Sequence, residues 1–251
     1  ALDLSIDLLF EKKSKESYIK TDLGYSMTFD INTTYKKSNN HWENYVLGTV
    51  NELKQIKSKL NNFSCLIKST LPSGAGISSS SALVCGLIKG LSVINNIDLD
   101  NAEIINLSRN VEHKYIGVLG GIMDQFTILN AKKNMGILLD CENLKTKYIN
   151  LDLGEYKLLL IDTNVKHNLA STEYNKRVIE CKQSLKIINR VCNSIYSNLS
   201  QVKEIDLSLS KNKLGQTLYK RASYILNENQ RVMKSANFLE NKSLKEFGQL
   251  M

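Results

Sequence analysis

The chain has 251 residues, of which 42% are hydrophobic and 23% charged, values typical of a soluble globular protein with a substantial core. This length allows one large domain or two smaller ones. Because no apolar run approaches the roughly 20 residues that a membrane-spanning helix needs, we expect no transmembrane segment. The opening ALDLSIDLLF carries Asp3 and Asp7 and lacks a basic leader, so it is interpreted as a strand rather than a signal peptide.

Basic residues outnumber acidic ones, 33 to 25, which gives a net charge of +8. The lysines are dispersed and no basic run is interleaved with aromatic residues, so we predict no nucleic-acid partner. The charge is interpreted as a solvated surface, with attraction of an anionic nucleotide as a secondary role. The five cysteines are scattered without a CxxC pair, which indicates reduced thiols in a cytoplasmic protein rather than disulfides or zinc.

Hydrophobic periodicity predicts strands first and helices last, an order typical of an α+β fold. Leu23-Gly24 is predicted to be a turn, and Asp98 and Asp100 are candidate helix caps. The predicted strands cover residues 2–12, 25–35, 63–70, 136–142, 146–152 and 156–165. The predicted helices cover residues 42–56, 82–96 and 101–116, and then nearly all of the chain from residue 171 onward.

A Gly/Ser loop, PSGAGISSSS at residues 72–81, lies between a predicted strand and an apolar helix. Gly74 and Gly76 permit a positive φ and a close approach of the backbone to a ligand. Serine hydroxyls and backbone N–H groups at a helix N-terminus attract an anion. A serine-capped helix after a glycine turn is the plainer explanation. Four consecutive serines after G-x-G exceed what a cap needs, however, so the loop is predicted to bind phosphate.

Two acidic residues are candidates for chemistry. Glu112 lies at the edge of an apolar helical stripe, where a carboxylate can face a cleft and supply a hard oxygen ligand to Mg²⁺. The common alternative is a surface glutamate. Asp124 follows Gly120-Gly121 within an apolar run, where an aspartate is costly to bury unless it is paired or functional. The alternative for Asp124 is a helix N-cap or a turn residue.

These motifs resemble those of galactokinases, which are GHMP kinases. PSGAGISSSSAL is similar to P-x-G-x-G-L-S-S-S-A, with Ile77 in the leucine slot and Ser81 where alanine is usual. Residues 112–126 resemble E-x-x-x-x-G-x-x-x-G-I-M-D-Q, and residues 163–177 resemble T-N-V-x-H-x-L-A-x-S-E-Y-x-x-R. Trp42 and Tyr45 match W-x-N-Y-V, although their helical spacing suits core packing equally well.

The resemblance implies transfer of the γ-phosphoryl group of ATP to the anomeric hydroxyl of galactose, with Mg²⁺ as a second cofactor. Asp124 is implied as the catalytic residue, because it would accept or orient the proton of the sugar hydroxyl. The implied binding residues are Gly74, Gly76, Ser78 and Ser79 for ATP, Ser80 (or Ser79) and Glu112 for magnesium, and Asp124 and Tyr174 for the sugar. His167 is interpreted as structural, and Arg177 is expected to pair with Glu173 or Glu180 on its own helix.

The resemblance also implies a GHMP kinase-like α+β fold with two lobes. Residues 1–130 are expected to form a strand-rich lobe that carries the phosphate loop and Asp124, and residues 131–251 a second lobe of strands followed by helices. The family's G-R-V-N-L-I-G-E-H-T-D-Y-like and T-G-x-G-F-G-G-like segments do not occur in these residues, so the chain is predicted to be incomplete at both ends. Activity is therefore expected of the complete protein rather than of this fragment.

Two alternatives to galactose phosphorylation stay open. One is a kinase that acts on a related sugar, such as N-acetylgalactosamine or arabinose. The other is a non-catalytic, galactokinase-like sugar sensor that acts through a protein partner. Retention of Glu112 and Asp124 disfavours the sensor. The expected ligands are a small-molecule sugar and ATP, with no membrane partner and an undetermined oligomeric state.

Overall fold

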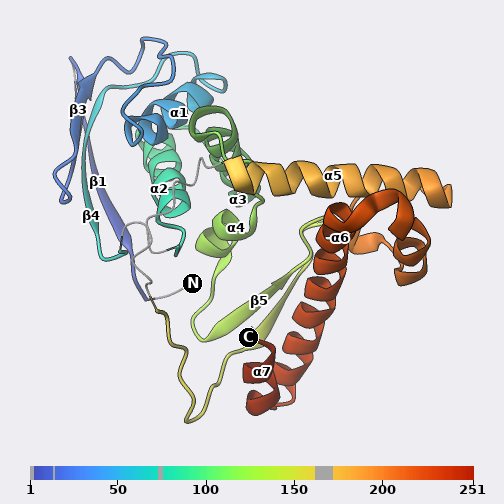
Figure 1. The fold of residues 1–251 in the computed structure, drawn as a ribbon. Coiled ribbons are helices and arrows are strands. Elements are labelled where there is room, and N and C mark those ends of the chain that lie inside the picture. Colours follow the sequence, from blue (N-terminus) through green and yellow to red (C-terminus); the bar gives the residue numbers. More distant parts are fainter. Residues whose placement is uncertain (1–2, 14, 73–75, 162–171) are drawn as a thin grey trace. The chain divides into compact units, whose positions relative to one another are not determined.

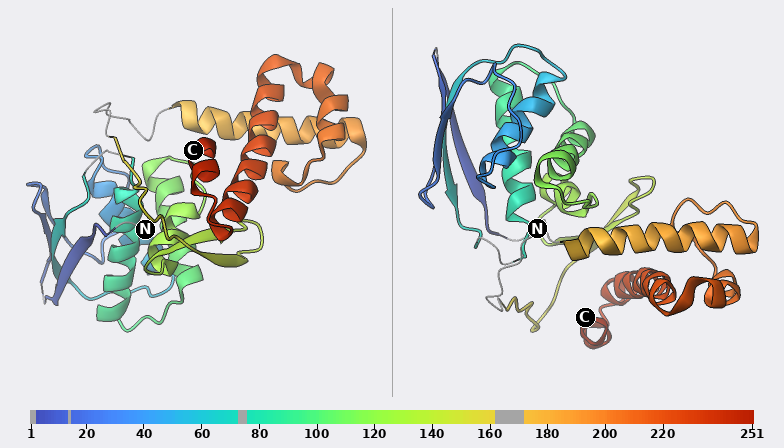
Figure 2. Two further views of the ribbon diagram at one scale, coloured as in Figure 1. Left: turned by 90° about the horizontal axis from the view of Figure 1, so that it is seen from below. Right: turned by 45° about the horizontal axis from the view of Figure 1, so that its top comes forward.

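The structure, a computed structural model, describes residues 3–13, 15–72, 76–161 and 172–251 (Figures 1 and 2). It divides into two compact units. The sheet unit consists mainly of Ala1–Lys133, and the helical unit consists of Ser171–Met251 together with Asn134–Leu138 and Thr146–Leu159. No helix among the described residues is long and apolar enough to cross a membrane.

A four-stranded sheet with the order β1-β4-β2-β3 forms one side of the sheet unit. Its strands are β1 (Ile6–Lys12), β2 (Ser17–Thr21), β3 (Ser26–Phe29) and β4 (Phe63–Ser69). Strand β4 pairs antiparallel with β1 and parallel with β2, while β2 and β3 form an antiparallel hairpin. The strands predicted at 2–12 and 63–70 are confirmed. The strand predicted at 25–35 ends at Phe29, and β2 was not predicted.

Helices cover one face of this sheet (Figure 1). Helix α2 (Ser79–Ile94) packs on β1, and α1 (Glu43–Lys54), α3 (Asn101–Val111) and α4 (Met123–Asn130) pack against α2. The π-helical turn η1 (Glu112–Ile116) continues α3 and packs on α1. Apolar side chains from both layers, such as Phe63 and Leu91, are fully buried between them. The predicted cap Asp100 is confirmed, because its side chain accepts a hydrogen bond from the Glu103 N–H at 2.8 Å. The helix predicted at 101–116 keeps α-helical geometry only to Val111.

The helical unit combines a two-stranded sheet with a pair of long helices. Strands β5 (Met135–Leu139) and β6 (Thr146–Asn150) pair with each other. The helices are α5 (Thr172–Cys192), the 3₁₀ turn η2 (Leu199–Gln201), α6 (Glu204–Glu240) and α7 (Leu244–Leu250). Helices α5 and α6 pack side by side around an apolar cluster that includes Ile188 and Leu226. A kink at Gly215, where φ is 66°, divides α6.

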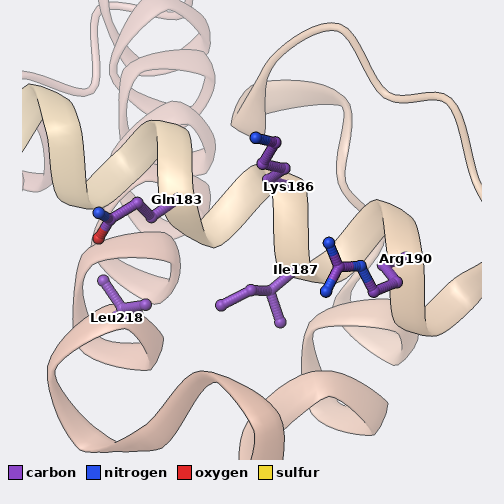
Figure 3. A pocket seen from close by; sticks show the side chains of 5 residues that line it. All are labelled: Gln183, Lys186, Ile187, Arg190 and Leu218. Atoms are coloured by element: carbon purple, nitrogen blue, oxygen red, sulfur yellow. The ribbon is translucent and has the colours of Figure 1, made fainter.

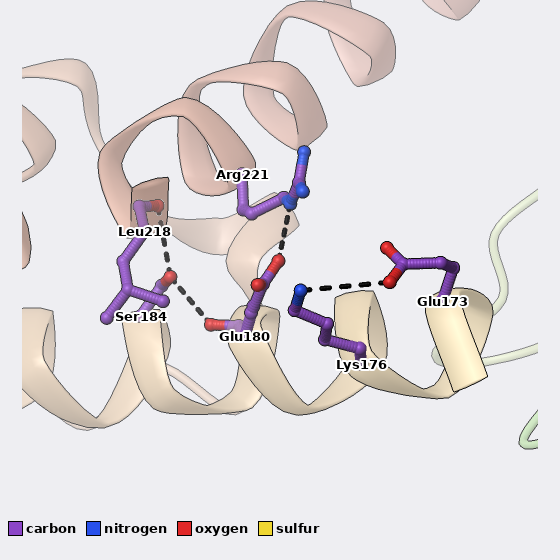
Figure 4. A network of polar contacts seen from close by, with 6 residues as sticks. All are labelled: Glu173, Lys176, Glu180, Ser184, Leu218 and Arg221. Carbon is purple, nitrogen blue, oxygen red and sulfur yellow. Dashed lines mark hydrogen bonds and ion pairs between the residues drawn. The ribbon is translucent and has the colours of Figure 1, made fainter. Parts of the chain in front are cut away.

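Polar contacts also join α5 to α6 (Figure 4). The Nε of Arg221 donates a hydrogen bond to Glu180 at 2.6 Å, and Ser184 Oγ lies 3.1 Å from the carbonyl oxygen of Leu218. The local partner expected for Arg177 is supported at Glu180, whose pKa is lowered first by the hydrogen bond from Arg221 and further by the charge of Arg177. Among the described residues, the ion pairs of the two candidate glutamates are Glu173 with Lys176 at 3.7 Å and Glu180 with Arg221 at 2.6 Å.

The strand predicted at 156–165 is wrong over the part that the structure describes. Residues 157–161 have no regular secondary structure, and residues 162–165 lie outside the described residues. Neither of the two described sheets includes this segment, so its backbone groups have no strand to pair with there. Leu159 and Ile161 are 83% and 74% exposed. An apolar run therefore predicted a strand correctly only where a pairing strand lies beside it.

Candidate active site

The described part of the Gly/Ser loop has a left-handed backbone. Gly76 has a φ of 74° and Ser78 a φ of 60°, and α2 begins at the next residue. Ser78 is the N-cap of α2, but its side chain makes no capping hydrogen bond. The explanation of the serine run as a cap is therefore not supported at Ser78. The first N–H groups of a helix have no intrahelical acceptor, so they can bind an anion. Gly74 lies outside the described residues.

Glu112 is the first residue of the π-helical turn and is only 9% exposed, so the surface-glutamate alternative is wrong. The hydroxyl of Ser81, on α2, donates a hydrogen bond to Glu112 Oε1 at 2.6 Å, and the side chain of Gln125, on α4, forms a second. Burial raises the pKa of Glu112 above its ordinary value. The two hydrogen bonds oppose that rise, and the charge of Asp124 adds to it.

Asp124 lies in the first turn of α4 and is half-buried. The N-cap of α4 is Ile122, so Asp124 is not the helix cap that the alternative expected. Its charge acts on the Glu112 carboxyl, which means that the two acidic groups share one region. Beside it, Gln125 is 1% exposed, and its Oε1 accepts no hydrogen bond from the described residues. A buried amide oxygen without a donor is rare in folded proteins.

Three elements thus bring oxygen groups together: α2 with its serines, η1 with Glu112, and α4 with Asp124. Protein-bound Mg²⁺ usually takes one or two carboxylates and completes its octahedron with water and substrate phosphate. Two carboxylates and serine hydroxyls fit that requirement. The described residues contain no cluster of three or more His, Cys, Asp or Glu that could hold a metal on its own.

The other predicted residues lie on other elements, and of these the Tyr45 hydroxyl lies close enough to Glu112 for that charge to raise its pKa, after the larger effect of burial. Tyr174 lies in the first turn of α5, in the helical unit, and is 48% exposed. His167 lies outside the described residues. Trp42 and Tyr45 pack against the core of the sheet unit, and the Trp42 ring lies 5.5 Å from that of Tyr25. This position favours the core-packing interpretation of the tryptophan.

The structure adds contacts that the motifs did not assign. Ser81, rather than Ser80, provides the hydroxyl that bonds Glu112. Gln125, which follows Asp124 in the D-Q motif, is buried beside Glu112 and forms a hydrogen bond with it, so it joins the candidate site. The sequence signal that could have indicated the Ser81 contact is that Ser81 occupies a motif position where alanine is usual, so this chain has an additional hydroxyl there.

A pocket of about 170 Å³ in the helical unit contains none of the predicted site residues. Figure 3 shows its lining side chains, which come from α5 and α6: Gln183, Lys186, Ile187, Arg190 and Leu218. Ile187 and Leu218 form its apolar part, and the charged ends of Lys186 and Arg190 lie on exposed residues.

Residues 44–132, which include α1 to α4 and the site, match the family model described as GHMP kinases N terminal domain. This match identifies that segment as a GHMP kinase N-terminal domain. The structure is similar to the crystal structure of Lactococcus lactis galactokinase complexed with galactose, with a TM-score of 0.88 and 27% identity. That similarity covers 99% of this chain and 65% of the Lactococcus chain.

Two relatives are more similar in sequence. A galactokinase of Thermosipho africanus is 32% identical over 251 residues, which cover all of this chain and 68% of the relative. A galactokinase of Clostridium tetani is 32% identical over 244 residues, or 96% of this chain and 61% of the relative. The chain belongs to the galactokinase family, and it spans about three fifths to two thirds of the length of these relatives. The resemblance and the fold class predicted from the motifs are confirmed.

Proposed function

We propose that the complete protein transfers the γ-phosphoryl group of ATP to the anomeric hydroxyl of galactose. One observation carries this proposal: Glu112 is buried beside Asp124 and the first turn of α2, and burial raises the pKa of its carboxyl although Ser81 and Gln125 donate hydrogen bonds to it. The charge of His113 and the two hydrogen bonds do not fully offset this burial. A carboxylate whose pKa stays raised by burial is a candidate functional group. Membership of the galactokinase family supports a sugar as the acceptor.

In this proposal the residues of the chain bind the triphosphate and the sugar, orient the sugar hydroxyl and hold the metal ion that offsets the phosphate charge. Gly76, Ser78 and Ser79, with Gly74, would hold the triphosphate through backbone N–H groups and hydroxyls at the start of α2. Glu112 and Ser80 would hold Mg²⁺, which when bound offsets the negative charge of the phosphate oxygens. Asp124 would orient the sugar hydroxyl and accept its proton. Tyr174 would pack against the sugar ring.

Galactose is proposed as the sugar because the relatives are galactokinases and the Lactococcus enzyme was crystallised with galactose. N-acetylgalactosamine or arabinose would use the same machinery. We also propose a cytoplasmic location. The five cysteines are all free in the structure, as expected in a reducing compartment.

A sugar panel tests the proposal. The complete protein is incubated with ATP, Mg²⁺ and galactose, N-acetylgalactosamine or arabinose, and ADP release is measured for each sugar. Galactose is expected to give the largest kcat/KM, with phosphate on the anomeric oxygen of the product. A larger kcat/KM for another sugar would overturn the assignment of galactose. Sugar and ATP binding without ADP release would favour the sensor.

A further inference from the structure

Glu52, on α1, is a buried carboxylate outside the residues that the proposed mechanism uses. It is 4% exposed. Its Oε1 accepts a hydrogen bond from Lys114 Nζ at 2.8 Å, and its Oε2 accepts one from Asn110 Nδ2 at 3.1 Å. Lys114 itself is 56% exposed at its side chain. One buried carboxylate therefore holds two side chains that lie 58 and 62 residues further along the chain.

The two side chains that Glu52 holds lie on either side of Glu112. Asn110 precedes Glu112 by two residues on α3, and Lys114 follows it by two residues on η1. The backbone changes here from α-helical to π-helical hydrogen bonding, and the Gly117 N–H bonds the Glu112 carbonyl oxygen at 2.8 Å. Single π-turns are rare and are frequent at functional sites. Their geometry needs support from neighbouring groups.

One helical turn before Glu52, Gly48 brings α1 against the same segment. A Cβ added at Gly48 would lie 2.8 Å from the Tyr115 ring and 2.9 Å from a Val111 methyl group. Distances below 3.0 Å essentially never occur for a real Cβ atom. Gly48 and Glu52 thus form one face of α1 that packs directly on the turn that carries Glu112. The contact at Gly48 sets the distance between α1 and the π-helical turn, and the Glu52 carboxylate holds the side chains of Asn110 and Lys114.

We propose that Glu52 is a positioning residue that holds the π-helical turn and so directs Glu112 toward Ser81 and Asp124. The inference rests on the proposed function for the role of Glu112, but the hydrogen bonds of Glu52 to Asn110 and Lys114 are a property of the metal-free protein. Residues that orient a metal ligand without touching the metal typically change metal affinity by 10- to 100-fold when they are removed. Loss of Glu52 is therefore expected to act on magnesium binding rather than on sugar binding.

The first test measures amide hydrogen exchange of residues 112–118 in the metal-free complete protein. Glu52→Ala removes both hydrogen bonds, and Lys114→Met removes one at an exposed position where the fold should tolerate the change. Both variants should speed exchange at Gly117 and Val118, whose N–H groups bond the Glu112 carbonyl oxygen. Lys114→Arg should retain wild-type exchange. Glu180→Gln, which breaks a buried ion pair in the helical unit, is the matched control and should leave this segment unchanged.

The second test measures Mg²⁺ affinity by calorimetry in the presence of ATP, together with the KM for galactose. Glu52→Ala should weaken Mg²⁺ binding about tenfold, while the galactose KM changes by less than about twofold. Unchanged exchange and unchanged Mg²⁺ affinity in both Glu52→Ala and Lys114→Met would overturn the positioning role. Absence of turnover in the wild-type protein would instead overturn the proposed function. The exchange result would still decide whether Glu52 holds the π-helical turn in place.

Discussion

Two glutamates buried to the same extent, one in each unit, have opposite electrostatic surroundings. Glu112 in the sheet unit is 9% exposed and Glu180 in the helical unit is 8% exposed. Glu180 accepts a hydrogen bond from the Arg221 guanidinium at 2.6 Å, and this bond lowers its pKa. Glu112 receives hydrogen bonds from Ser81 and Gln125, and burial raises its pKa. Among the described residues, no lysine or arginine forms an ion pair with Glu112.

The difference predicts a structural role for Glu180 and availability for chemistry for Glu112. A lowered pKa means that ionised Glu180 stabilises the fold above its unfolded pKa of about 4.3, and this contribution is lost as the pH falls. A raised pKa means that ionised Glu112 costs stability at neutral pH, and protonation relieves that cost. Burial alone therefore does not separate the two carboxylates, whereas the direction of the pKa shift does.

The largest expected effect is on turnover. Asp124→Asn keeps the shape of the side chain and removes its charge, so the complete protein should fold and bind ATP normally. Loss of a general base typically lowers the rate by about 100- to 10,000-fold, and kcat for galactose should fall within that range. ADP release under saturating substrates measures it. Near-normal turnover would show that Asp124 is not the catalytic residue.

The next effect concerns the left-handed glycine of the phosphate loop. Gly76→Val forces a β-branched residue into a φ of 74° and should weaken ATP binding by about 2 kcal/mol, or about 30-fold. Gly154→Val is the matched control, because Gly154 also has a positive φ, of 54°, but belongs to the helical unit. Calorimetry should detect weaker ATP binding only in the Gly76 variant. Equal ATP affinities in the two variants would remove the basis for a phosphate loop.

A third prediction tests the two glutamates through stability. In the absence of Mg²⁺, Glu112→Gln removes a buried charge that its neighbours offset only in part, and should leave Tm unchanged or raise it. Glu180→Gln breaks the ion pair with Arg221 and should lower Tm at pH 7. The Tm deficit of Glu180→Gln should shrink as the pH falls below about 4.5, because the Glu180 carboxyl takes up a proton in the unfolded chain before it does so in the folded protein. A lower Tm for both variants would mean that Glu112 has a stabilising partner.

The smallest effect concerns the thiols of the sheet unit. Burial raises the pKa of Cys65 to about 12 and that of Cys85 to about 11. Both should resist alkylation by iodoacetamide at pH 8, because almost no thiolate is present and reagent access is blocked. Cys141 is exposed and should react first. Mass spectrometry of the labelled native protein identifies the modified cysteine, and early labelling of Cys65 would indicate an open core.

Periodicity and capping chemistry predicted much of the sheet unit, including β1, β4, α1 and the cap at Asp100. The strand β2 was not predicted because it has only five residues, most of them polar, and its pairing with the distant strand β4 holds it in place. The prediction for residues 157–161 was wrong for the opposite reason. Their apolar side chains predict a strand, but neither described sheet has a strand that pairs with them.

The site was predictable only as far as its motifs reach. Glu112 and Asp124 could be identified because burying a carboxylate in apolar surroundings costs free energy unless the group is paired or functional. The bond between Ser81 and Glu112 joins residues 31 positions apart, and no local pattern specifies such a contact. The same holds for Glu52, whose partners lie on other helices. The roles of Gly76, Ser78, Ser79, Ser80 and Tyr174 stay predictions, as does that of Gly74.

The most direct test of the account is a Mg²⁺ titration of ADP release with galactose, run on the complete protein as wild type, Glu112→Gln and Glu180→Gln. If Glu112 is available for a cation and Glu180 is structural, the curve of Glu112→Gln should shift to higher Mg²⁺ by about tenfold or more. The curve of Glu180→Gln should coincide with that of the wild type. Coincidence of the Glu112→Gln curve with the wild-type curve would contradict the claim that this carboxylate holds the metal.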